Sequence, residues 1–74
     1  MDYSLEMMYN NCLNFNGNLG ILQNNIKNMI QFLKILSHNK IITTAEADSY
    51  YNKLEKLFIE TMEEAQKHPY YYIG

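Results

Sequence analysis

The chain has no arginine and no tryptophan, and it has one cysteine and one proline among 74 residues. Because Cys12 is the only cysteine, no internal disulfide can form, and a lone thiol suits a reducing compartment better than secretion. The lack of arginine and a formal net charge of −2 argue against binding to a nucleic-acid backbone, which needs a basic face. We therefore expect a cytoplasmic protein without a nucleic-acid partner.

Long apolar runs are missing as well. Asn, Gln or Lys interrupts each apolar stretch within a few residues, so we expect no membrane span and no signal peptide.

Cys12, His38 and His68 are the only soft or imidazole ligands, and they show none of the paired spacings of zinc sites. We expect no catalytic residue, no metal and no cofactor.

The chain length limits the fold to one domain, residues 1–74. So small a domain buries a modest fraction of its surface, and its stability is correspondingly marginal. Small domains without disulfides or metals often gain stability by forming oligomers. The short chain and the lack of an internal disulfide therefore favour self-association.

What the chain does contain is a helical repeat of apolar side chains. Between residues 5 and 36 they recur at steps of three and four, which is the heptad pattern of a packed helix. We call this row the seam; it consists of Leu5, Met8, Cys12, Phe15, Leu19, Leu22, Ile26, Met29, Leu33 and Leu36. Asparagines are frequent in this segment, but all of them lie off the seam.

A second helical segment is predicted at about residues 44–67. Thr43 followed by Glu46 is the pattern of a capping box, which marks a helix start. Pro69 marks its end, because the residue before a proline is disfavoured in a helix. Residues 68–74 then form a tail that contains three consecutive tyrosines.

The stretch NFNGNLG, residues 14–20, leaves two architectures open. Since the seam keeps its phase across this stretch, we favour one helix over about residues 3–38 and leave open a bend or break at 16–18. With the second helix it forms an antiparallel hairpin. In the alternative, Gly17 adopts a left-handed conformation and Asn18 caps a new helix.

That alternative is a monomeric three-helix bundle with helices at 4–16, 19–38 and 44–67. The hairpin instead leaves the start of the long helix overhanging, with an apolar row that should not remain in water. It therefore predicts a homodimeric helical bundle. The expected oligomer interface comprises Leu5, Met8, Cys12, Phe15, Leu19, Leu22, Ile26 and Met29.

Two features suggest a surface for another protein. Tyrosine is enriched at protein interfaces, and in the hairpin Tyr70, Tyr71 and Tyr72 would lie beside Tyr3 and Tyr9. In addition, an uncharged face of the first helix can approach another surface without desolvating ions. Its members are Leu13, Gly17, Gly20 and Ile21. The alternatives are that the tyrosines only cover the overhang and that the asparagines reflect an AT-rich genome.

These patterns favour an all-α, non-catalytic interaction module, a small adaptor or inhibitor that occupies the surface of a partner protein. Its size and acidity also suit the short inhibitors that phages and other mobile elements direct at host machinery, which is an analogy at the level of the class. The alternative is an oligomer that binds or sequesters a nucleotide-like ligand in a groove between subunits.

Overall fold

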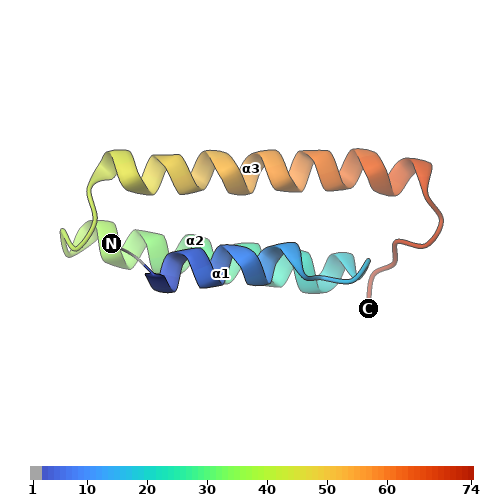
Figure 1. Ribbon diagram of the computed structural model, residues 1–74, viewed down its shortest axis with the longest axis horizontal. Helices are drawn as coiled ribbons and strands as arrows, with labels where there is room; N and C mark the ends of the chain where they lie inside the picture. Colours follow the sequence, from blue (N-terminus) through green and yellow to red (C-terminus); the bar gives the residue numbers. More distant parts are fainter. Residues whose placement is uncertain (1–2) are drawn as a thin grey trace.

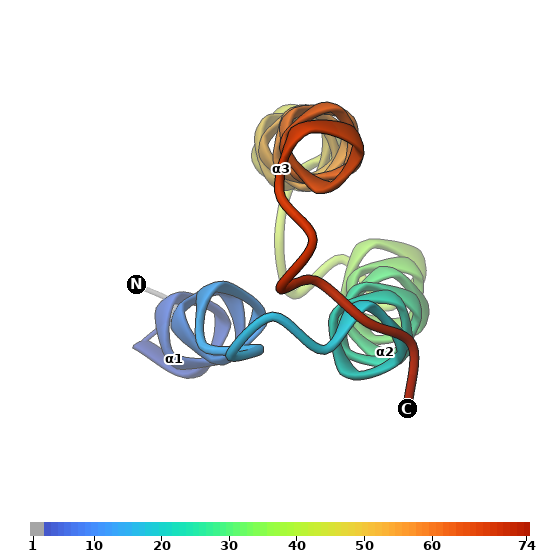
Figure 2. The same ribbon diagram turned by 90° about the vertical axis from the view of Figure 1, so that its right-hand side faces the viewer.

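A computed structural model describes residues 3–74, which form three α-helices: α1 (Tyr3–Leu13), α2 (Leu19–His38) and α3 (Thr44–Lys67). The predicted all-α class is confirmed for this part of the chain. Helices α2 and α3 run side by side in opposite directions, and α1 lies along them (Figure 1). Seen end-on, the three helices occupy the corners of a triangle (Figure 2).

The continuous helix expected over residues 3–38 is not formed. Helix α1 ends at Leu13, and residues 14–18 make a loop before α2 begins. Asn16 and Gly17 have φ angles of 54° and 79°, in the left-handed region. Two successive residues in this region cannot continue a right-handed helix, so the chain turns here. The alternative with three helices is the one that the structure shows, with a shorter first helix.

Helix α2 begins where Asn18 acts as its N-cap, as the three-helix alternative predicted. The Asn18 side-chain oxygen accepts hydrogen bonds from the backbone N–H groups of Gly20 at 3.0 Å and Ile21 at 3.2 Å. These N–H groups lack a partner within the helix, so the cap satisfies them. Local side-chain chemistry thus fixes the start of α2.

Helix α3 begins with the predicted capping box. The Glu46 N–H donates to Thr43 Oγ1 at 3.0 Å, and the Thr43 N–H donates to Glu46 Oε1 at 2.9 Å. At its other end α3 stops at Lys67, two residues before Pro69. Both boundaries of this helix agree with the prediction.

The seam packs inward although it is divided between two helices. The loop at 14–18 reverses the chain, so α1 and α2 lie antiparallel (Figures 1 and 2). Both helices contribute buried apolar side chains to one core. The buried apolar core comprises Leu5, Cys12, Leu22, Ile26, Met29, Leu33, Leu36, Ile42, Ala47 and Leu54. With α1 folded back, there is no overhang that a second copy must cover.

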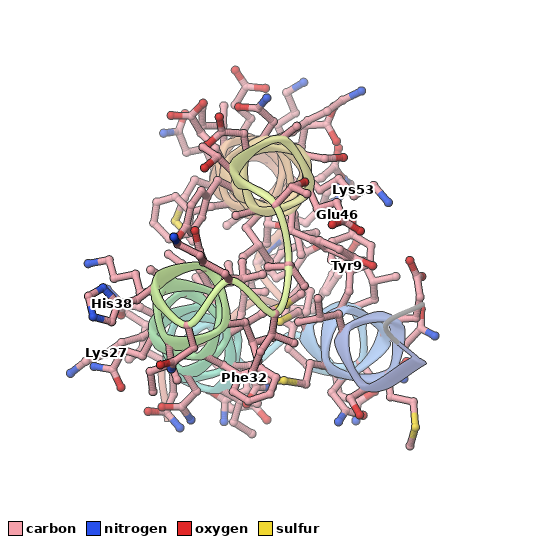
Figure 3. All side chains as sticks on the ribbon, turned by 90° about the vertical axis from the view of Figure 1, so that its left-hand side faces the viewer. Tyr9, Lys27, Phe32, His38, Glu46 and Lys53 are labelled. Atoms are coloured by element: carbon pink, nitrogen blue, oxygen red, sulfur yellow. The ribbon has the colours of Figure 1, made fainter. Side chains whose placement is uncertain are left out.

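Polar and aromatic contacts join α1 to α3. The Tyr50 hydroxyl donates to Glu6 Oε1 at 2.8 Å. Lys53 Nζ lies 5.5 Å from the ring centroid of Tyr9 and 5.2 Å from that of Tyr50, within range of a cation–π interaction. Figure 3 shows Tyr9, which belongs to α1, and Lys53, which belongs to α3, on the same side of the molecule. This side of the molecule is therefore occupied by contacts within the chain.

The capping box predicts a dependence of stability on acid. Hydrogen bonds from the Thr43 backbone and side chain lower the pKa of Glu46 below its ordinary value of 4.5. A carboxyl group with a lowered pKa in the folded state stabilises that state above its unfolded pKa, and this contribution is lost as the pH falls through the folded pKa. We expect Glu46 to contribute at neutral pH and not in strong acid.

The matched variant for this prediction is Glu46→Gln, which keeps an N3 acceptor but does not titrate. Urea unfolding at about pH 6 and about pH 3 should show the wild type losing more stability in acid than the variant. Other carboxyl groups titrate equally in both proteins, so the difference isolates Glu46. An identical loss in both would contradict the assignment.

Candidate functional site

The C-terminal tail, residues 68–74, leaves α3 and crosses the start of α2 (Figure 2). The Leu19 N–H donates to the Tyr72 carbonyl at 2.6 Å, and the Tyr72 N–H donates to the Gly17 carbonyl at 2.9 Å. Asn18 and Tyr72 thereby form an isolated parallel β-bridge. The tail is held by its backbone, which leaves its side chains available for other contacts.

A second attachment fixes the tail further along α2. The Gly74 N–H donates to Asn18 Oδ1 at 3.1 Å, so the side chain that caps α2 also binds the tail. A Cβ atom on Gly20 would lie 2.6 Å from the Gly74 carbonyl oxygen, closer than real Cβ contacts come. The glycine at this position therefore allows the tail to lie directly on the helix.

Aromatic rings form a row from the end of α3 to the 14–18 loop. The ring centroids of His68 and Tyr70 are 5.1 Å apart, those of Tyr70 and Tyr71 are 4.9 Å apart, and those of Tyr71 and Phe15 are 6.1 Å apart. At the start of the row, His68 Nε2 lies 2.8 Å from Glu64 Oε1. These contacts orient the rings relative to one another.

The row borders a shallow hollow of about 440 Å³. The hollow is lined by Leu13, Phe15, Asn16, Gly17, Tyr70 and Tyr71. Tyr70 is 63% exposed and Tyr72 is 53% exposed, which is high for large aromatic side chains. Desolvation, followed by the charges of Tyr70 and Glu64, raises the pKa of Tyr71, so its phenol stays neutral at physiological pH. We call the surface formed by Leu13, Phe15, Gly17, Tyr70, Tyr71 and Tyr72 the tyrosine end.

The structure brings part of the predicted partner surface together. Leu13 and Gly17, predicted from the uncharged face, meet Tyr70 and Tyr71 of the tail around one hollow. Two further members of that face border this region, Gly20 under the tail and Ile21 exposed on the first turn of α2. The stacked Phe15 belongs to this surface too, although its seam position suggested a buried residue.

The other two tyrosines do not join this surface, so the expected gathering of five tyrosines at one end is wrong. Tyr9 lies near Lys53, in the middle of the α1–α3 contact. Tyr3 is the first residue of α1, at the end of that helix away from the 14–18 loop (Figure 1), and its side chain is outside the described part of the chain. Both placements follow from the reversal of α1.

The residues expected at an oligomer interface are covered by the chain itself. Leu5, Cys12, Leu22, Ile26 and Met29 are buried in the core, and Met8 and Phe15 pack against it while partly exposed. Leu19 is half-buried at the start of α2. Most of this seam is therefore occupied by contacts within the chain, and the members that keep more exposed surface are Met8, Phe15 and Leu19.

Metal and thiol chemistry find no support in the described residues. Burial raises the pKa of Cys12, so its thiol is protonated and enclosed by the core. Within residues 3–74, no three His, Cys, Asp or Glu side chains come together as a metal site would require. None of the helices in this range combines the length and hydrophobicity of a membrane span.

Comparisons with protein-family models, with curated proteins and with solved structures found no match to this chain. Functional inference therefore rests on the geometry of the molecule.

The sequence-based site prediction did not include one feature, an open groove between α2 and α3. Its signal was present in Ile30 and Phe58, which extend the apolar faces of their helices beyond what one neighbour can cover.

Proposed function

We propose that this chain is a non-catalytic, cytoplasmic protein-interaction module that binds a partner protein through the tyrosine end. It would act as an adaptor or as an inhibitor that occupies the partner's surface, of the kind that phages and mobile elements use. The chemistry of the surface suits a partner that inserts an apolar side chain into the hollow beside Tyr70 and Tyr71.

The observation that carries this proposal is the combination of exposed aromatic rings with a fixed backbone. Tyr70 and Tyr72 are mostly exposed, yet the tail that bears them is hydrogen-bonded to Gly17, Asn18 and Leu19. A preordered surface loses little conformational entropy on binding. Tyrosine adds large contact area with a polar tip, and such residues often dominate interface energies.

The test is a binding comparison between wild type and Tyr70→Ala. A tagged chain is used to capture partners under native conditions, and any captured protein is purified and its affinity for each variant measured. We expect Tyr70→Ala to weaken binding at least about tenfold, corresponding to the 1–2 kcal/mol or more of an aromatic hot spot.

The matched control is Ile41→Ala, which removes an equally exposed apolar side chain, 65% against 63%, at the opposite end of the molecule. It should leave the affinity unchanged. Circular dichroism must show both variants to be folded. Equal affinities of wild type and Tyr70→Ala, or a larger loss with Ile41→Ala, would refute the tyrosine end as the binding site.

A second candidate is the nucleotide-like ligand expected as the alternative. The observation in its favour is that Lys27, Lys34 and Tyr51 all line the groove between α2 and α3, where a phosphate and a stacked base could be held. Glu55 lines the same groove and counts against an anion. A melting shift with a nucleotide panel would favour this candidate, since a ligand of the folded state stabilises it.

A further inference from the structure

A groove of about 600 Å³ lies between α2 and α3, on the side away from α1. Its floor is apolar and includes Ile26, Ile30, Leu54 and Phe58, of which Ile30 and Phe58 remain half-buried. Toward the tail the apolar surface continues over Leu19, Met62 and Ile73. An apolar strip of this length along two helices is typical of a packing face.

The other two sides of the triangle differ from this one. Between α1 and α3, Tyr50, Glu6 and Lys53 already make contacts with one another or with Tyr9. Between α1 and α2, the hollow is small and three of its four lining residues are asparagines. The α2–α3 side thus differs from the other two in having an open groove with an apolar floor.

Charges border this groove in a defined order. Lys27 and Lys34 lie on the α2 edge, one heptad apart, and both line the groove. Glu55 lies on the α3 edge, and Asp48 precedes it by one heptad on the same line. One edge is therefore basic and the other acidic. Figure 3 shows Lys27 projecting from the side of α2 that faces away from α1.

These charges also match in height. Lys34 is four residues before the end of α2, and Asp48 is four residues after the start of α3. Lys27 and Glu55 are each eleven residues from the same helix ends. Because both helices rise about 1.5 Å per residue from the connecting loop, Lys34 is level with Asp48 and Lys27 is level with Glu55.

We propose that a second copy of this chain covers the α2–α3 groove, related by a twofold axis parallel to the helices. Such an axis keeps every residue at its own height and places α2 of one copy antiparallel to α3 of the other. Lys27 then faces Glu55 of the second copy, and Lys34 faces Asp48 of the second copy. The floors of the two grooves meet in the middle, around Ile30 and Phe58.

Charge selects this arrangement over the other twofold dimer. An axis perpendicular to the helices would place α2 against α2 and α3 against α3, bringing like charges together on both edges. The face is about 30 Å long, from the 20 residues of α2, and the molecule is 17 Å wide, which suits a small specific interface. The groove shares no lining residue with the hollow of the tyrosine end, so this proposal does not depend on the proposed partner site.

The experiment is a pair of charge reversals measured by sedimentation from micromolar to submillimolar concentration. Wild type should approach twice the 8.8 kDa chain mass as concentration rises. K27E/K34E makes both edges acidic and D48K/E55K makes both basic, so each alone should dissociate at least about tenfold more readily. Mixing the two variants should restore a dimer, because acidic edges then meet basic ones.

The matched control is K56E/K67E, which changes the net charge as K27E/K34E does but alters α3 residues that do not line the groove. It should dimerise like wild type. Circular dichroism checks that each variant keeps its helices. If either double variant is unfolded, the single variants K27E and E55K are used in its place. A monomeric wild type at all concentrations, a dimer indifferent to K27E/K34E, or no heterodimer on mixing overturns the proposal.

Discussion

Replacing Leu22 with alanine should destabilise the folded chain by about 2–5 kcal/mol, the usual cost of truncating a fully buried leucine. Leu22 is 0% exposed and lies in the core shared by the three helices. A domain of this length has a free energy of unfolding of roughly 4–11 kcal/mol. The variant should therefore melt at least about 10 °C lower, and thermal and urea unfolding can both measure the loss.

The control for this variant is the neighbouring Ile21→Ala. Ile21 is 45% exposed, so the same kind of truncation should cost well under half as much. The dependence on protein concentration provides a second check. If Leu22 lies in the core of a single chain, its truncation lowers the stability of that chain equally at every protein concentration. If the cost of Leu22→Ala instead vanished on dilution, the seam would belong to an interface between chains, as the hairpin hypothesis required.

The seam shows what periodicity can and cannot predict. Seven of the ten seam residues are buried in the core, because helical spacing determines which side of a helix is apolar; Met8, Phe15 and Leu19 are only partly buried. Periodicity does not determine whether the seam lies on one helix or on two. A loop of suitable length keeps the phase, and the in-phase seam then resembles a continuous helix.

The backbone preferences of residues 14–18 determine that the chain forms two helices here and not one. Asn16 and Gly17 both accept a left-handed conformation at low cost, and Asn18 is a preferred N-cap. Together these local preferences favour a loop more strongly than the in-phase seam favours a continuous helix, so the loop was predictable from them. The capping box at Thr43 and Glu46 was predictable from the sequence because its two partners lie three residues apart.

The tyrosine end was predictable only in part. The exposed tail could be expected from Pro69 and the tyrosines that follow it, and the uncharged face from the sequence around Gly17. Their meeting depends on the Tyr72 bridge to Gly17 and Leu19, a pairing between segments more than 50 residues apart. Long-range backbone pairing of this kind leaves no periodic signal, so only the structure could show which tyrosines belong together.

Replacing Asn18 with alanine should cost about 1–3 kcal/mol, more than a simple helix cap. Its side-chain oxygen accepts from the N–H groups of Gly20 and Ile21 in α2 and from that of Gly74 in the tail. Asn18 is largely buried, so its loss leaves donors that water reaches poorly. We expect both a lower melting temperature and faster hydrogen exchange at the Tyr72 amide, which is bonded to Gly17.

Asn18→Ser separates the two roles of this side chain. Serine is a good N-cap, but its hydroxyl is one atom closer to the backbone and should not reach the Gly74 N–H as well. The serine variant should therefore recover most of the lost stability of α2 while the Tyr72 amide still exchanges rapidly. If serine restored protection at Tyr72 in full, the tail would be held without Asn18. The exposed rings of Tyr70 and Tyr72 would then owe their fixed positions to the backbone bridge alone.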